Sequence, residues 1–276
     1  MKTFNYFYQK NKIFLFGISL LFFLLLLNIL LPLFLFADNQ FFNLSYKSFL
    51  PPSKKHWLGT DFIGHDLFEY IIKGMTTSLY ISVSAIFISG LLGCVLGLLG
   101  GYFHGFFGFL TNFICDLLIV CPDFILAFLI VLFYGRGACQ LIIVLSICYL
   151  PTFIKNIKAA TIQISQKDFV KNAFALGAGH FYIVKKHVFP HILNTLLIRM
   201  TLSLSSVILV VSYFGFIGVG LDSSVPEWGS LLSMNRLYAD MYPRLFFYPM
   251  IFIILTNLSF NCIAEGLMQY WNSHNN

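Results

Sequence analysis

The sequence predicts an all-α membrane protein in which six transmembrane helices form a single bundle. Two observations lead to this prediction. Of the 276 residues, 58% are hydrophobic and 10% are charged, whereas a water-soluble domain carries about 25% charged residues. Apolar runs of roughly 20 residues, long enough to cross a bilayer as a helix, also recur along the chain. We therefore expect one helical bundle and no separate globular domain.

Six apolar runs mark the predicted membrane helices, at residues 13–36, 77–102, 111–134, 138–154, 192–215 and 245–267. The first run follows Lys2, Lys10 and Lys12 but is too long for a signal peptide and has no clear cleavage site. We expect it to remain as a membrane helix. The chain then divides into residues 1–74 (cytoplasmic tail, first helix and external segment), 75–268 (transmembrane domain) and 269–276 (short cytoplasmic tail).

The second run contains a stripe of small residues at three- and four-residue spacing, made of Gly90, Gly93, Gly97, Gly100 and Gly101. Such stripes let neighbouring helices approach closely in a membrane. We interpret this one as a packing surface, in preference to a substrate contact. The six cysteines lie mostly in apolar segments with no C-x-x-C pair, and we expect them to be packing residues that bind no metal.

The charges indicate the topology. The segment between the fourth and fifth runs holds a single acidic residue, Asp168, and six lysines: Lys155, Lys158, Lys167, Lys171, Lys185 and Lys186. Cytoplasmic loops are enriched in such cations, so this segment and both termini should face the cytoplasm. The net charge of +6 is spread between apolar runs and forms no patch with interleaved aromatic residues, so we expect no nucleic-acid partner.

The basic loop has local helix signals. Ser165 and Asp168 form a capping-box pattern for a short helix at 166–176, and Gly177 should end it. A second short helix is expected at 181–188, and Pro190 suits the first turn of the next membrane helix. Phe169 and Phe174 are apolar residues in this loop that need a surface to pack on. A cytoplasmic protein and anionic lipid headgroups both remain open at this point.

Three motifs in the same order resemble those of a known family. FVKNAFALGAGHFYIVKKHVFP (169–190) resembles the EAA loop of ABC-importer permeases, with Gly177 and Pro190 at the usual spacing. HWLGTDFIGHDLFEYIIKG (56–74) and FGFIGVGLDSSVPEWGSLL (214–232) resemble segments of the second-permease branch of the peptide/nickel family. The loop departs from the family in one respect, since Lys171-Asn172-Ala173 replaces the usual acidic-Ala-Ala triplet.

The resemblance implies the type I ABC importer permease fold and a non-catalytic permease subunit in the bacterial inner membrane. It implies a homologous permease as heterodimer partner, two ABC ATPase subunits that bind ATP and Mg, an extracytoplasmic binding protein, and surrounding lipid. The chain has no G-x-x-x-x-G-K-[ST] phosphate loop, so we expect it to bind no cofactor itself. Small peptides and nickel, free or chelated, remain equal candidates for the cargo.

The resemblance also implies two sets of site residues. The ATPase-coupling loop comprises Asp168, Lys171, Asn172, Ala173, Leu176, Gly177, Ala178 and Pro190. The external motifs comprise Gly59, Thr60, Asp61, Gly64, Asp66, Pro226, Glu227, Trp228 and Gly229. His56 and His65 beside Asp61 and Asp66 suggest a metal site as an alternative, but we favour a structural cap or docking element.

Arg199, Ser203 and Ser206 are polar residues in the otherwise apolar fifth run, and they are candidates for the transport pathway. Arg199 lies close enough to Pro190 to extend its side chain to the cytoplasmic interface, and we favour that reading or bundle packing. A membrane protease would need an H-E-x-x-H or G-x-S-x-G motif, which the sequence lacks. An ATP-independent channel or membrane structural subunit is the alternative function.

Overall fold

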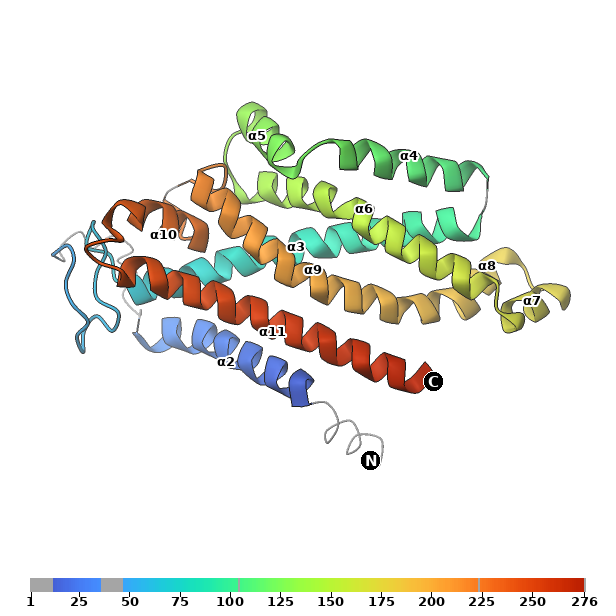
Figure 1. Cartoon of the computed structure of the whole chain (residues 1–276), viewed down its shortest axis with the longest axis horizontal. Helices are drawn as coiled ribbons and strands as arrows, with labels where there is room; N and C mark the ends of the chain where they lie inside the picture. Colours follow the sequence, from blue (N-terminus) through green and yellow to red (C-terminus); the bar gives the residue numbers. More distant parts are fainter. Residues whose placement is uncertain (1–11, 36–46, 104, 223, 276) are drawn as a thin grey trace.

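The computed structural model describes residues 12–35, 47–103, 105–222 and 224–275. In these ranges the chain is helical apart from its loops and one isolated bridge between Thr60 and Asp66. The long helices lie roughly side by side (Figure 1). Loop 47–66 and α10 lie at one end of the bundle, called the α10 end, and α7 and α8 lie at the other, called the α7 end.

The elements in chain order are α2 (Lys12–Leu35), α3 (Leu67–Tyr102), α4 (Phe106–Val120), α5 (Asp123–Tyr134), α6 (Ala138–Ser165), α7 (Asp168–Ala175), α8 (His180–Ile183), the π-helical turn η1 (Val184–Val188), α9 (Phe189–Ile217), α10 (Trp228–Asn235), the 3₁₀ turn η2 (Arg236–Tyr238) and α11 (Arg244–Asn275). Within the described ranges, five helices are long and apolar enough to cross a membrane, or six if α4 and α5 together count as one span. The predicted all-α membrane bundle is confirmed.

The third predicted span is wrong as a single helix. Residues 111–134 form α4 and α5, which are bent by 81°. The break falls at Cys121 and Pro122, and Pro122 has an extended ψ of 135°. Proline has no N–H to donate and its ring crowds the preceding turn, so a helix cannot continue through it without distortion. Asp123 becomes the first residue of α5.

Other helices extend beyond the predicted apolar runs. The second span was predicted from residue 77, but α3 begins at Leu67, where the Asp66 side chain accepts bonds from the Phe68 and Glu69 N–H groups. Helix α6 continues past residue 154 to Ser165, and α11 runs to Asn275. Hydropathy shows only where an apolar segment ends. A helix can extend beyond that point into polar sequence, because its backbone hydrogen bonds do not require apolar side chains.

The glycine stripe of α3 is a packing surface, as predicted. A methyl group built on Gly97 would lie 2.8 Å from Ile157 Cβ, and one on Gly101 would lie 2.6 Å from Thr161 Cβ. Both partners belong to α6, which packs closely along α3. On the opposite side of the bundle, α2 packs against α11, and a methyl group on Gly17 would lie 2.8 Å from Cys262 Cβ.

The short helix predicted at 181–188 is not a separate element. Helices α8, η1 and α9 form one continuous helix over His180–Ile217. The π-helical turn accounts for this continuity, because the Phe189 N–H donates to Val184 O one residue further back than in an α-helix. The widened turn stands directly before Pro190, whose missing N–H would otherwise interrupt the bond pattern. Pro190 lies in the first turn of α9, as predicted.

Candidate functional site

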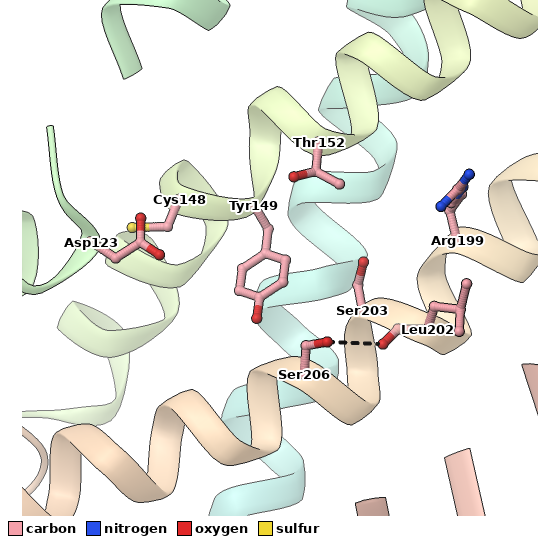
Figure 2. Close-up of a pocket in the computed structure, with 8 residues that line it drawn as sticks. All are labelled: Asp123, Cys148, Tyr149, Thr152, Arg199, Leu202, Ser203 and Ser206. Carbon is pink, nitrogen blue, oxygen red and sulfur yellow. Dashed lines mark hydrogen bonds between the residues drawn. The ribbon is translucent and has the colours of Figure 1, made fainter. Parts of the chain in front are cut away.

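A polar pocket of about 420 Å³ lies between α5, α6 and α9 (Figure 2). It is lined by Asp123, Cys148, Tyr149, Thr152, Arg199, Leu202, Ser203 and Ser206. The three residues predicted as pathway candidates, Arg199, Ser203 and Ser206, all belong to this lining. Their spacing of four and three residues places them on one face of α9. The structure therefore brings these three candidates together at one surface of the bundle.

The charges of the pocket come from two elements. Asp123 and Arg199 lie at opposite ends of it, with Tyr149 between them (Figure 2). Ser206 Oγ donates to Leu202 O at 3.4 Å. Asp123, Tyr149 and Thr152 were missed by sequence reasoning. The available signal was Pro122-Asp123, a helix-breaking pair with a charge in the middle of an apolar run.

The predicted coupling helix exists as α7, but its predicted cap is wrong. Lys167 is the N-cap residue, and its side chain makes no capping bond. Ser165 instead donates its hydroxyl to Thr161 O at 2.7 Å, because α6 continues far enough to include it. Asp168 is therefore the first residue of α7. At that position its negative charge interacts favourably with the helix dipole and stabilises the helix. Lys171 and Asn172 are exposed on α7.

Gly177 ends α7 as predicted, at a φ of +85°. The Gly177 N–H donates to Phe174 O at 2.9 Å, and the Ala178 N–H donates to Ala173 O at 3.1 Å. This left-handed turn satisfies the last carbonyl groups of the helix. Large apolar side chains remain exposed at the α7 end of the bundle, with exposed fractions of 58% for Phe174 and 89% for Leu176.

Aromatic contacts position α7 on the long helices. The Phe169 ring stacks on His191 at 5.2 Å between centroids, and the Phe174 ring lies 5.4 Å from that of His180. His180 in turn lies 3.0 Å, Nδ1 to Oη, from Tyr102 at the end of α3. Movement of α7 would therefore act on both α3 and the continuous helix 180–217.

The motif at 59–66 forms a compact turn that begins α3. Asp61 Oδ1 accepts the N–H groups of Ile63, Gly64 and His65 at 2.7–2.9 Å, and Asp66 caps α3. Thr60 is buried and its hydroxyl donates to Lys47 O at 2.8 Å. These residues build a structural cap at the α10 end. Part of the predicted external segment, residues 36–46, lies outside the described residues.

The two histidines of this turn belong to separate pairs. His56 Nδ1 lies 2.8 Å from Asp66 Oδ2, and His65 Nδ1 lies 3.1 Å from Asp61 Oδ2. The hydrogen bond with Asp61 raises the pKa of His65, although burial opposes this. Within the described ranges no cluster of three or more His, Cys, Asp or Glu residues could hold a metal ion.

Arg244, a residue that sequence reasoning missed, fastens this cap to α11. Its Nη2 donates to Phe49 O at 3.0 Å and to Leu50 O at 2.7 Å. Gly59 lies beside it at a φ of +82°, and a methyl group there would overlap Leu50 O. The available signal was an arginine after Pro243, directly before the last apolar run.

The Pro226–Gly229 motif joins three helices at the α10 end. Glu227 is completely buried and caps α10, because its carboxylate accepts the N–H groups of Gly229 and Ser230 at 3.1 and 3.2 Å. Trp228 Nε1 donates to Ile71 O of α3 at 3.0 Å. A methyl group on Gly229 would overlap the Ser212 carbonyl of α9. Half-buried Pro226 leads into this junction.

Burial raises the pKa of Glu227 to about 7, and its two backbone hydrogen bonds oppose that rise. The carboxyl group is packed against α9, where a methyl group on Gly215 would overlap it. A short helix capped by a buried carboxyl group is a structural junction. The Pro226–Gly229 motif therefore holds α3, α9 and α10 together.

A bundle of apolar helices with a polar pocket on one side and an aromatic, basic loop at one end is typical of a multi-pass membrane permease. Comparison with known proteins specifies the class. Residues 91–274 match the family described as "Binding-protein-dependent transport system inner membrane component", and the chain belongs to this family. It is an inner-membrane permease subunit of an ABC importer, as the motif resemblance implied.

Relatives named as transport-system permeases agree with this assignment. The chain is 32% identical over 216 residues to the glutathione transport system permease protein GsiD of Escherichia coli O1:K1, covering 78% of this chain and 71% of that protein. It is 32% identical, with the same coverage, to GsiD of Shigella boydii serotype 4. It is 29% identical to GsiD of Pectobacterium atrosepticum, covering 78% and 72% of the two chains.

Proposed function

We propose that this chain is one half of a heterodimeric permease that imports small peptides, driven by ATP hydrolysis on two partner ATPase subunits. The observation that carries the proposal is a polar pocket linked to an exposed loop by one rigid element. Arg199, Ser203 and Ser206 line the pocket from the same continuous helix, His180–Ile217, that begins beside α7. A force on α7 would therefore reach the pocket directly.

The α7 end supplies the contact with the ATPases. Phe174 and Leu176 are exposed there beside Lys171, and an apolar patch with a basic rim suits a protein cleft. The lysines of this end support a cytoplasmic position for it, and the start of α2 and the end of α11 lie towards the same end of the bundle (Figure 1). ATP and Mg would bind the partner subunits, because this chain has no phosphate loop. The subunit itself would be non-catalytic.

The α10 end would then face outward and receive cargo from an extracytoplasmic binding protein. Its surface is a rigid cap held by Arg244, Asp61 and Asp66, which suits repeated docking of a partner. A homologous permease would complete the pathway, since the pocket opens on the side of this single chain. Its relatives in the comparison are named for glutathione transport, and glutathione is a small peptide. This similarity favours a peptide over nickel as the cargo.

Uptake by cells that lack only this protein tests the proposal. Labelled glutathione, alanine tripeptide and nickel would be compared, with the gene restored as control. We expect loss of peptide uptake and unchanged nickel uptake. Loss of nickel uptake alone would overturn the peptide cargo. Peptide uptake that persists when the partner ATPases are inactivated by substitution would indicate an ATP-independent channel instead.

A further inference from the structure

We propose that the pocket between α5, α6 and α9 is a transit site that binds both charged ends of a zwitterionic peptide. Arg199 would bind the terminal carboxylate, and Asp123 would bind the terminal ammonium group. This inference rests on the proposed peptide import and adds a rule of specificity to it. The rule is that the permease itself, and not only the binding protein, recognises free peptide termini.

The first step of the argument is the placement of the two charges. Arg199 lies on α9 and Asp123 at the start of α5, at opposite ends of the pocket (Figure 2). Neither side chain forms an ion pair with any residue in the described part of the chain. Charges inside membrane segments are costly to maintain and are kept where they meet a partner. Asp123 makes a side-chain hydrogen bond with Cys148, but neither charge has a counter-ion in the described part of the chain, so a ligand could supply one.

The second step is the fold that places Asp123 there. The 81° bend between α4 and α5 puts Asp123 at the first position of α5. At a helix N-terminus the first backbone N–H groups have no partner within the helix, so polar groups gather at this position. Without the break at Pro122, this residue would lie within a straight span. The bend thus turns an otherwise apolar helix into one wall of a polar pocket.

The third step is chemical complementarity. A guanidinium group binds a carboxylate through two parallel hydrogen bonds, and a carboxylate binds an ammonium group equally directly. A pocket with one charge of each sign suits a molecule that is neutral but carries separated charges. Free Ni²⁺ would meet a repulsive cation at Arg199. The pocket volume of about 420 Å³ falls within the range of roughly 300–1,000 Å³ common for small-molecule sites.

The middle of the pocket should discriminate little between the side chains of different peptides. Tyr149, Ser203 and Ser206 offer hydroxyl groups between the two charges, and hydroxyls both donate to and accept from peptide groups. Recognition would therefore depend on the backbone and the two termini. Such a site would accept peptides of varied sequence while excluding those with blocked ends.

Proteoliposomes that contain the complete transporter, with ATP inside and binding protein outside, provide the test. Uptake of alanine tripeptide, its C-terminal amide and its N-acetyl derivative would be measured for each variant and divided by the wild-type uptake of the same compound. Any preference of the binding protein cancels in this ratio. The variants are Arg199→Gln, Arg199→Lys and Asp123→Asn. Arg136→Gln and Asp222→Asn remove matched exposed charges outside the pocket.

We expect Arg199→Gln to reduce uptake of the free tripeptide about tenfold and uptake of the amide less than about twofold, since one charged contact is worth about a factor of ten. Asp123→Asn should instead spare the N-acetyl derivative. Arg199→Lys should restore most of the loss, and both control variants should match the wild type. Binding-protein-stimulated ATP hydrolysis, measured in the same vesicles, should remain within about twofold of the wild-type value in the two control variants.

Equal losses for the free and blocked peptides would overturn the inference and would indicate a structural role for the two charges, with peptide import intact. Uptake of the free tripeptide at the wild-type level in both Arg199→Gln and Asp123→Asn would also overturn it. Absence of uptake of all three compounds by the wild-type transporter would overturn the peptide cargo, and with it the transit site. The two failures are therefore distinguishable.

Discussion

The carboxyl group of Glu227 lies directly against the backbone of Gly215, leaving no room for even one methyl group on that glycine. Gly215 belongs to the last turns of α9, and Glu227 caps α10. The contact therefore joins the end of the longest continuous helix to the motif that also binds α3 through Trp228. This small junction connects the pocket-lining helix to the cap at the α10 end.

Gly215→Ala should destabilise the protein by about 1–3 kcal/mol, because the added methyl group overpacks a buried junction. Alanine is the better helix former, so a loss cannot come from helix propensity. Gly108→Ala is the matched control, since a methyl group there would meet its nearest atom at an ordinary 3.6 Å. Thermal unfolding in detergent measures both variants. Equal stability of the two would contradict the packing argument.

Glu227→Gln should remove a pH dependence of stability. The folded pKa of Glu227 is raised to about 7 from an ordinary value of 4.5, so the folded state holds the proton more tightly than the unfolded state. Stability is then greatest below about pH 4.5 and falls as the pH rises towards about 7, by on the order of 3 kcal/mol. Glutamine cannot titrate, so the variant should lack this fall.

His65 adds a second decline that the Glu227 variant should retain. Its pKa is raised chiefly by the hydrogen bond with Asp61, so its contribution is present at low pH and lost as the pH rises through the raised value. Unfolding midpoints measured from pH 4 to 8 in wild type, Glu227→Gln and His65→Gln separate the two groups. Identical profiles for wild type and Glu227→Gln would show that folding leaves the pKa of Glu227 at its ordinary value.

Gly177→Ala should impair coupling without a steric clash. No atom lies within 4 Å of a methyl group at this position, but the φ of +85° is unfavourable for alanine, costing about 1–2 kcal/mol. We expect uptake to fall several-fold while ATP hydrolysis continues, because the turn that presents α7 is disturbed. Gly179→Ala is the control, since that position has a φ of −68° and equally open surroundings. A parallel fall in both variants would point to the loop surface and away from the turn.

Arg244→Leu should loosen the cap at the α10 end, because the Phe49 and Leu50 carbonyl groups would lose their donor. Bonds from a charged group contribute about 1.5–3 kcal/mol each, so we expect a lower unfolding midpoint and faster trypsin cleavage at the lysines of 47–66. Arg136→Leu removes an exposed arginine elsewhere and should leave both quantities unchanged. Unaltered cleavage in Arg244→Leu would exclude this role for Arg244.

Hydropathy and helix-ending signals predicted much of the fold. Apolar runs located the membrane segments, apart from the division of the third into α4 and α5, because a bilayer requires its spanning segments to be apolar along their length. The glycine stripe predicted a close helix approach, which the structure shows between α3 and α6, and Gly177 predicted the end of α7. These features depend on nearby residues alone. Pro122 was also a local signal for the α4–α5 break, but it lies within one continuous apolar run, which favoured the prediction of a single span.

The pocket and the α10-end junction were less accessible to sequence reasoning. Arg199, Ser203 and Ser206 were recognised as polar residues on one helix, but Asp123 and Tyr149 reach the pocket only because α5 and α6 pack beside α9. Arg244 binds carbonyl groups nearly two hundred residues earlier in the chain. Such contacts depend on how helices pack, which no local pattern records. The capping-box prediction at Ser165 failed because α6 extended through it.

The continuity of His180–Ile217 has a mechanical consequence. At 1.5 Å per residue, its 38 residues form a rod of about 57 Å, longer than the bilayer is thick. A rod that pivots near its middle carries its two ends in opposite directions. An inward swing at His180 would become an outward swing at Ile217, with Arg199 near the pivot. One lever could thus open the pathway on one side of the membrane as it closes the other.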